Sequence, residues 1–214
     1  MTPVNSSKPF WTWFQANAES LTMLNDLEAD ESKRLLDDMQ VQLDAYAPGL
    51  SYEIGEPTPS GRTLTFSAEG DMELFPHVIS LVENAPDVDW WEFVAFRQPK
   101  GTGLKVLFDR YRFDTSKMYF MQLECEEEPD ILGLRVALDE KMVVGGKKVA
   151  QNDEDLQVGL YVTLEAMIGE FDCSTLIGYL DSCPLPAEPF KEGFRPLDDL
   201  PAFVDWFKSR RDKE

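Results

Sequence analysis

The sequence predicts an α+β protein: a mixed or antiparallel sheet with helices on one face, preceded by an N-terminal helical hairpin. Three observations support this class. Apolar residues recur every three or four positions in several long segments, as in helices. In shorter segments bounded by glycine and proline, they alternate as in strands. Hydrophobic residues make up 43% of the 214 residues, enough to offset the entropy cost of folding.

The first 50 residues predict two amphipathic helices after a flexible tail over residues 1–8. Trp11, Phe14, Ala18 and Leu21 form one apolar stripe at helical spacing. A second helix is expected to start near Asp30, whose carboxylate suits an N-cap, and to end at Pro48-Gly49. Its apolar stripe is Leu35, Leu36, Met39, Leu43 and Tyr46.

The remaining chain changes to alternating strands and further helices. Turn residues and apolar periodicity predict strands at 50–54, 64–67, 91–97, 105–108, 110–113, 118–125, 131–138 and 173–180. Helices are expected after Asp71, after Asn152-Asp153 and around Leu200 to Phe207. The acidic run at 124–130 is interpreted as a solvated hairpin turn, and residues 141–148, which include Gly145-Gly146, as a loop.

Residues 50–99 and 104–183 share one order of predicted elements: strands, a buried helix and a closing strand. Two fused ferredoxin-like units would give this order, and a single mixed sheet covered on one face by helices explains it equally well. Because no linker rich in glycine or serine separates the halves, we expect one compact domain over residues 9–214.

The charge is strongly acidic, and it restricts the classes of partner. Forty Asp and Glu against twenty Lys and Arg give a formal net charge of −20, which disfavours nucleic acids and anionic membranes and attracts a basic protein. No apolar run is long enough to span a bilayer. Three cysteines without a CxxC pair favour a reducing compartment, and the N-terminus lacks the apolar core of a secretory signal. We therefore expect a cytoplasmic location.

No complete catalytic or metal-binding motif is present. The sequence has neither a phosphate-binding glycine loop nor a nucleophile elbow. His77 is the one histidine, so we expect no zinc site, no cofactor and no assignable catalytic residue, although a pair between His77 and a cysteine stays open. Glu69, Asp71 and Glu73 cluster where a helix begins, a position that the helix dipole favours for acids.

Two features are candidates for binding. A basic stretch interrupts the acidic chain, and it predicts either an anion-binding patch or ion pairs with the chain's own carboxylates. Strand alternation directs one ring of Trp90-Trp91 to the core and the other outward, where it can anchor a partner. The basic stretch comprises Arg97, Lys100, Lys105, Arg110, Arg112 and Lys117. The candidate binding residues are Trp90, Trp91, Arg97, Arg110, Arg112 and Glu69.

Three segments resemble an uncharacterised bacterial protein family. The resemblance is carried by four stretches: 10–17 (FWTWFQAN) as the first segment, 74–78 (LFPHV) leading to 95–99 (AFRQP) as the second, and 168–172 (IGEFD) as the third. The resemblance covers roughly residues 9–186 and implies no activity, so no catalytic residue is carried over. A looser likeness is to acidic regulators of the ribonuclease E inhibitor kind.

The sequence thus leads to two functional hypotheses. The first is a non-enzymatic protein-binding or regulatory protein, of which an immunity or inhibitor protein is one type, using its acidic surface or the outward tryptophan. The second is an enzyme or small-ligand binder with a site between helices and sheet, built from Arg97, Glu69 and nearby carboxylates.

Overall fold

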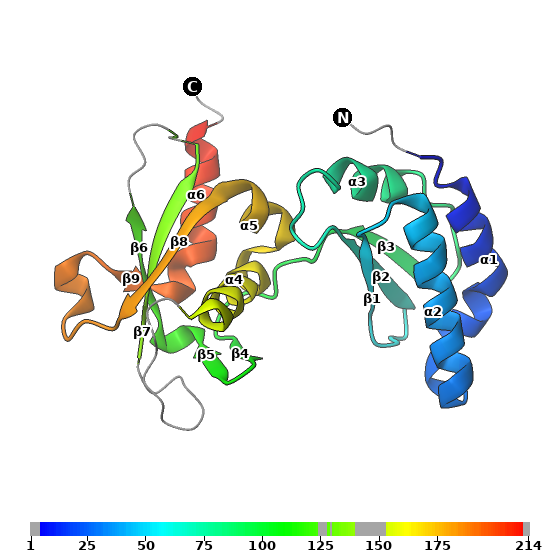
Figure 1. The fold of residues 1–214 in the computed structure, drawn as a ribbon, viewed down its shortest axis with the longest axis horizontal. Coiled ribbons are helices and arrows are strands. Elements are labelled where there is room, and N and C mark those ends of the chain that lie inside the picture. Colours follow the sequence, from blue (N-terminus) through cyan, green and yellow to red (C-terminus); the bar gives the residue numbers. More distant parts are fainter. Residues whose placement is uncertain (1–4, 124–127, 129, 140–152, 212–214) are drawn as a thin grey trace. The chain divides into compact units, whose positions relative to one another are not determined.

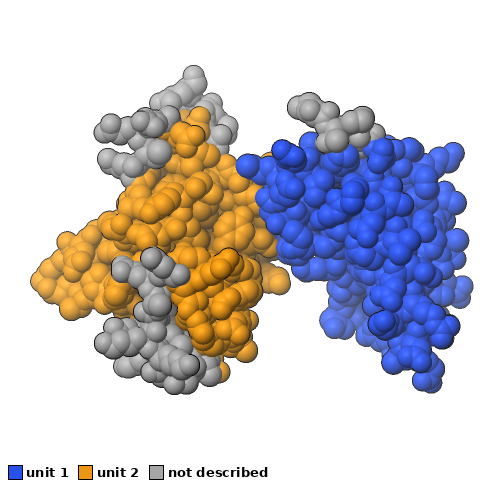
Figure 2. Space-filling model, viewed as in Figure 1, with its two compact units in different colours: residues 1–97 blue, residues 98–214 orange. Residues whose placement is uncertain are grey.

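The computed structural model describes residues 5–123, 128, 130–139 and 153–211. The chain forms two compact units, residues 1–97 and residues 98–214, coloured separately in Figure 2. Each unit has its own hydrophobic core. The sequence predicted one compact domain over 9–214, whereas the described chain has two cores, which are therefore treated separately below.

Unit 1 is a three-stranded sheet with three helices (Figure 1). The strands lie in the order β1-β2-β3, with β1 antiparallel and β3 parallel to β2. The parallel neighbour requires a crossover, which helix α3 supplies. The helices are α1 (Lys8–Thr22), α2 (Ala29–Tyr46) and α3 (Phe75–Glu83), and the strands are β1 (Ser51–Ile54), β2 (Arg62–Ser67) and β3 (Trp91–Ala95).

The core of unit 1 lies between the helices and one face of this sheet. Phe66 of β2 and Phe93 of β3 contact aromatic rings of α1, with centroid distances of 4.6–5.8 Å. The alternate residues of the strands, including Glu53, Thr63 and Glu92, lie on the opposite face of the pleat. The predicted helical hairpin and the helices on one face are both present.

Unit 2 holds a four-stranded sheet and a separate two-stranded hairpin. The larger sheet has the order β8-β7-β6-β9, with β7 antiparallel to β6 and parallel to β8. The core of unit 2 is formed by β5, β6, β7 and β8 with helices α4, α5 and α6. The strands are β4 (Lys105–Phe108), β5 (Tyr111–Asp114), β6 (Tyr119–Leu123), β7 (Leu132–Leu138), β8 (Ile177–Pro184) and β9 (Arg195–Pro196), and the helices are α4 (Glu154–Ile168), α5 (Glu170–Leu176) and α6 (Leu200–Arg211).

Local signals explain why α4 begins and ends where it does. Asp153 is the N-cap, and its carboxylate accepts a hydrogen bond of 3.4 Å from the Leu156 amide, as the sequence predicted. Gly169, with φ +85°, ends the helix. The predicted strand at 173–180 is wrong in its first half, because residues 170–176 form α5 and the strand is Ile177–Pro184. Cys173 and Leu176, both buried and three residues apart, have the spacing of one helix face.

Both units contain two antiparallel strands, a helical crossover and a third, parallel strand. In unit 1 these are β1, β2, α3 and β3; in unit 2 they are β6, β7, α4 with α5, and β8. The order of elements in the described segments differs from the β-α-β-β-α-β order of a ferredoxin-like unit, and hairpin β4–β5 has no counterpart in unit 1. A repeat of 50–99 in 104–183 stays a prediction beyond this shared topology.

Some predicted segments lie wholly or partly outside the described residues. These are the tail at 1–4, most of the acidic run at 124–130 and the loop at 141–148. Of the predicted tail, Asn5 donates a hydrogen bond of 2.7 Å to the Tyr46 carbonyl, and Lys8 already belongs to α1. No helix within the described part of the chain is both long and apolar enough to cross a membrane.

Candidate functional site

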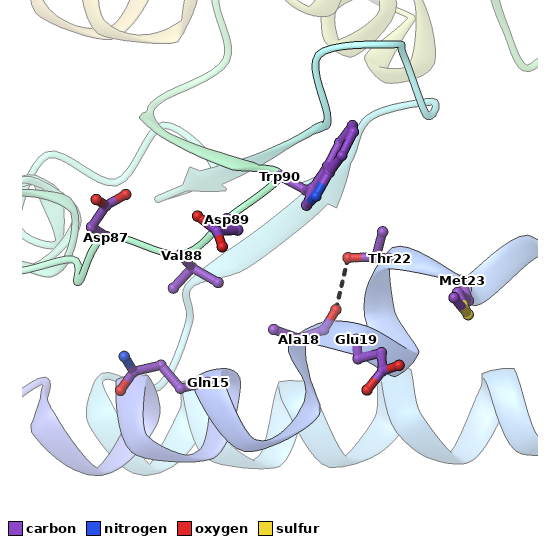
Figure 3. Close-up of a pocket in the computed structure, with 9 residues that line it drawn as sticks. All are labelled: Gln15, Ala18, Glu19, Thr22, Met23, Asp87, Val88, Asp89 and Trp90. Atoms are coloured by element: carbon purple, nitrogen blue, oxygen red, sulfur yellow. Dashed lines mark hydrogen bonds between the residues drawn. The ribbon is translucent and has the colours of Figure 1, made fainter.

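A pocket of about 780 Å³ lies in unit 1, between the C-terminal half of α1 and the loop that enters β3 (Figure 3). The residues contributed by α1 recur at helical spacing, so they lie along one stripe of the helix. The loop faces this stripe from the other side of the pocket. The lining residues are Gln15, Ala18, Glu19 and Thr22 of α1, Met23 directly after it, and Asp87, Val88, Asp89 and Trp90 of the loop.

The pocket is acidic, and none of its lining residues in the described part of the chain is basic. Glu19 extends from the helix, whereas Asp87 and Asp89 lie across from it on the loop (Figure 3). None of the three carboxylates forms an ion pair with a described basic side chain. Residues 5–123, 128, 130–139 and 153–211 contain no group of three or more metal-binding side chains close enough to hold an ion. The separated charges therefore suit an extended organic cation better than a chelated metal.

Trp90 supplies the aromatic surface of the pocket. Its side chain is 60% exposed, although large aromatic residues are usually buried. The residue has a positive φ of 69°, which is uncommon for any residue other than glycine. The Arg62 amide donates a hydrogen bond of 2.8 Å to the Trp90 carbonyl and fixes this backbone against the start of β2. The protein thus holds an exposed ring in a costly conformation at the pocket.

Gly61 makes this arrangement possible. A Cβ atom at Gly61 would lie 2.4 Å from the Trp90 carbonyl oxygen, closer than atoms can approach. Gly61 also has a φ of +123°, which side chains disfavour. Only glycine lets the Trp90 backbone pass this close to β2.

Trp91 supports the pocket wall instead of lining the pocket. Its ring contacts Phe14 edge to face, with 5.1 Å between centroids. Its indole N–H donates a hydrogen bond of 3.0 Å to the Thr22 hydroxyl, which donates one of 2.8 Å to the Ala18 carbonyl. Of the two adjacent tryptophans, one ring therefore packs inward and the other points outward, as alternation predicted.

Arg62 is a second support, and sequence reasoning missed it. Its side chain is buried, and its guanidinium donates hydrogen bonds to the Leu21 carbonyl (3.2 Å) and the Asn25 side chain (2.7 Å). Leu21 lies at the C-terminal end of α1, where the helix dipole is negative and a cation is favourable. Arg62 consequently fixes the end of α1, where Thr22 and Met23 line the pocket.

Arg97 and Glu69, two of the predicted binding residues, are joined elsewhere in unit 1. The Arg97 guanidinium forms ion pairs with Glu53 (2.6 Å) and with Glu69, and the Ser51 hydroxyl also donates to Glu69. Glu53 lies on the sheet face opposite the helices, so this cluster is not located between helices and sheet. None of its members lines the pocket.

The ion pair has a consequence for stability against pH. Arg97 lowers the pKa of Glu69 by hydrogen bonding, and burial opposes this shift only partly. A carboxylate with a lowered folded pKa stabilises the fold at neutral pH, and this contribution disappears as pH falls through the folded pKa. We expect Glu69→Gln to lower the free energy of unfolding by no more than about 1 kcal/mol at neutral pH, since the group is half exposed.

Urea denaturation at neutral pH and at about pH 3 would test this, because a smaller fraction of the carboxylate is ionised at the acidic value. The difference between wild type and Glu69→Gln should shrink at the acidic pH. Glu92→Gln, at an exposed position of β3 outside the Arg97 cluster, is the matched control. Equal differences for Glu69→Gln at both pH values would contradict the assignment.

Arg110 and Arg112 belong to unit 2, on hairpin β4–β5. Arg110 forms an ion pair with Asp153 and lies over the Tyr111 ring, 5.2 Å from its centroid. The hydrogen bond to Tyr111 is the main cause that raises the pKa of Arg110. Arg112 is exposed opposite Leu107 of β4. Because Arg97 belongs to unit 1, the basic stretch divides between the units, and several of its members pair with the chain's own carboxylates.

The described residues considered for a cysteine–histidine pair are partly or fully buried, with His77 in unit 1 and the two described cysteines in unit 2. His77 is buried in unit 1, with its ring centroid 6.0 Å from that of Tyr46. Burial raises the pKa of the Cys173 thiol to about 12, so it stays protonated at neutral pH. Burial also raises the pKa of Cys183, and Cys125 lies outside the described residues.

No protein-family model, no curated protein and no solved structure matches this chain. The family resemblance described from the sequence therefore stays a prediction.

Proposed function

We propose that this chain is a non-enzymatic binding protein whose unit 1 pocket receives a cationic side chain of a basic protein partner. A regulator of the inhibitor or immunity type belongs to this class. One observation carries the proposal: a concave site combines the exposed Trp90 ring with three carboxylates, and none of the lining residues that the structure describes is basic.

The recognition chemistry follows from these groups. A guanidinium or ammonium group over an indole face gains about 0.5–2 kcal/mol from the ring quadrupole, depending on how far it is desolvated. Carboxylates on both sides of the pocket add attraction and hydrogen-bond acceptors. Beyond the pocket, the net charge of −20 steers a basic partner toward this protein and raises its association rate at low salt.

The size of the pocket supports a second candidate, a free small organic cation. Its volume of about 780 Å³ is within the range of small-molecule sites. A free ligand and the side chain of a partner would use the same Trp90 face and the same carboxylates. The two candidates therefore differ in whether a peptide chain is attached to the cationic group, and the experiment must compare ligands with and without such a chain.

Calorimetric titration of the full chain at low salt tests the proposal. The probes are a short peptide in which arginines alternate with glycines, the same peptide with glutamine for arginine, and free arginine. Of the two peptides, we expect only the arginine peptide to bind. Trp90→Ala should weaken its binding by about tenfold, because the cation–π contact is lost. Glu19→Gln should also weaken binding, and Trp90→Phe should retain part of it.

Asp38→Asn is the matched charge control, because Asp38 is an exposed carboxylate of α2 outside the pocket. If Asp38→Asn weakened binding of the arginine peptide as much as Glu19→Gln does, the attraction would come from net charge alone and the site would be refuted. Free arginine binding as tightly as the peptide would favour the small-ligand candidate. Absence of binding by every probe at low salt would refute both candidates.

A further inference from the structure

A strip of two arginines and two aromatic rings lies on unit 2, independent of the unit 1 pocket. The arginine–aromatic strip consists of Arg195, Phe203, Trp206 and Arg210. The Arg195 guanidinium carbon lies over the Phe203 ring, 5.5 Å from its centroid, and that of Arg210 lies 5.0 Å from the Trp206 centroid. The two rings are 5.3 Å apart and tilted by 35°.

Two elements build this strip on rigid supports. Arg195 belongs to β9, where it pairs with Phe120 of β6. Phe203, Trp206 and Arg210 follow one another at spacings of three and four along α6, which places them on one helix face. Phe203 is buried and contacts the Phe120 ring at 5.4 Å, whereas Trp206 is 47% exposed. The sheet thus anchors one end of the strip, and Trp206 presents its ring outside.

Each of the two arginines lies over an aromatic ring and has no described carboxylate partner. Of the other described arginines, Arg97, Arg110 and Arg135 lie within ion-pair distance of a carboxylate, as do several lysines such as Lys208. Neither the Arg195 nor the Arg210 guanidinium makes an ion pair or hydrogen bond with any described residue. Asp205, the carboxylate next to Trp206 on α6, is engaged by Lys208 at 3.5 Å. Stacking on the rings leaves the N–H groups of both guanidiniums for a ligand.

We infer that the arginine–aromatic strip docks an acidic peptide segment of a partner protein. A planar carboxylate matches the fork of guanidinium N–H donors, which a stacked ring holds in place at low entropy cost. The exposed Trp206 ring between the two arginines offers apolar contact to the same segment. The charge of the strip, opposite to that of the chain as a whole, argues for a ligand with few, localised negative charges.

The same balance of charge disfavours a nucleic acid. A polyphosphate backbone is attracted by many basic groups acting together, whereas this protein carries a net charge of −20 and the strip holds two arginines. A short acidic peptide brings carboxylates to the two arginines without placing a long anion against the remaining surface. Binding of an oligonucleotide is therefore an outcome that would contradict the inference.

Nuclear magnetic resonance of the full chain, with its arginine side chains labelled, tests the inference at low salt. The probes are a short oligoglutamate peptide with one leucine, its glutamine counterpart and a short oligothymidylate. We expect the acidic peptide to shift the Arg195 and Arg210 Nε–H signals. Arg195→Gln or Arg210→Gln should weaken binding of this peptide by about tenfold, as loss of a charged hydrogen bond does. Both positions are exposed, so these variants should fold normally.

Arg34→Gln is the matched control, since Arg34 is an exposed arginine of α2 without an aromatic ring beneath it. It should leave binding of the acidic peptide within about twofold, as expected for a remote screened charge. Three results would overturn the inference: no shift of the two arginine signals, equal weakening by Arg34→Gln, or tighter binding of the oligothymidylate than of the acidic peptide. Unit 1 pocket variants such as Trp90→Ala should not change this binding.

Discussion

Gly61→Ala is expected to lower the free energy of unfolding of unit 1 by about 3 kcal/mol and to weaken the cation binding proposed for the pocket. Two costs combine. The new Cβ atom would lie 2.4 Å from the Trp90 carbonyl oxygen, a backbone atom that no rotamer change can move aside. Its residue would also have to keep a φ of +123°. To relieve the clash, the segment carrying Trp90 must move away from β2.

Gly101→Ala separates these two costs. Gly101 also has a positive φ, of +91°, but a Cβ atom there would meet nothing within 4 Å. Its substitution should cost about 1 kcal/mol, the backbone part alone. Urea denaturation and titration with the arginine peptide would measure both variants. If Gly61→Ala proved as mild as Gly101→Ala, Gly61 would not be what holds Trp90 in place.

Phe14→Ala should have a still larger effect, a loss of about 4 kcal/mol, because it opens a cavity in the unit 1 core. The Phe14 side chain is fully buried, and its ring contacts those of Trp11, Trp91 and Phe93 at centroid distances of 5.1–5.8 Å. The loss would also remove the ring on which Trp91 packs, and Trp91 holds Thr22 in the pocket wall.

Amide hydrogen exchange is the suitable measurement, because it reports the opening of individual elements. Protection should fall in α1 and in β2 and β3, which share the aromatic cluster. Val41→Ala, at a 60% exposed position of α2, should change stability by no more than about 0.5 kcal/mol. Unchanged protection of β3 in Phe14→Ala would show that the aromatic contacts do not stabilise the sheet.

Local patterns in the sequence were sufficient for most elements of the fold. The stripe from Leu156 to Ile168, with Asp153 before it and Gly169 after it, predicted α4 almost to the residue. Such signals are local, since capping and periodicity depend on neighbours in the chain. Strand β9, with two residues, is too short to have a period and depends on its pairing with β6. The division into two cores likewise depends on which apolar faces meet in space.

The pocket was only partly predictable. The sequence predicted that one of Trp90 and Trp91 points outward, without saying which. Trp90 precedes β3 and has a positive φ, so strand alternation alone does not determine its direction. The α1 stripe of Gln15, Glu19 and Thr22 could have been found as a polar face at helical spacing. Its approach to Asp87 and Asp89, about seventy residues later in the chain, depends on tertiary packing. Arg97 and Glu69 were correctly singled out as charged neighbours, but they meet each other at a different place.

The parallel third strand of each sheet also determines when the sheet can close. β1 and β2 are joined by a short turn and can pair as soon as both have left the ribosome, whereas β3 must wait until α3 has been synthesised. During that interval one edge of β2 has unpaired amide and carbonyl groups, which attract other extended chains. In unit 2 the interval between synthesis of β7 and synthesis of its parallel partner β8 is longer, because two helices separate the two strands. The nascent protein therefore passes through two periods of exposure to misassociation, of which the second lasts longer.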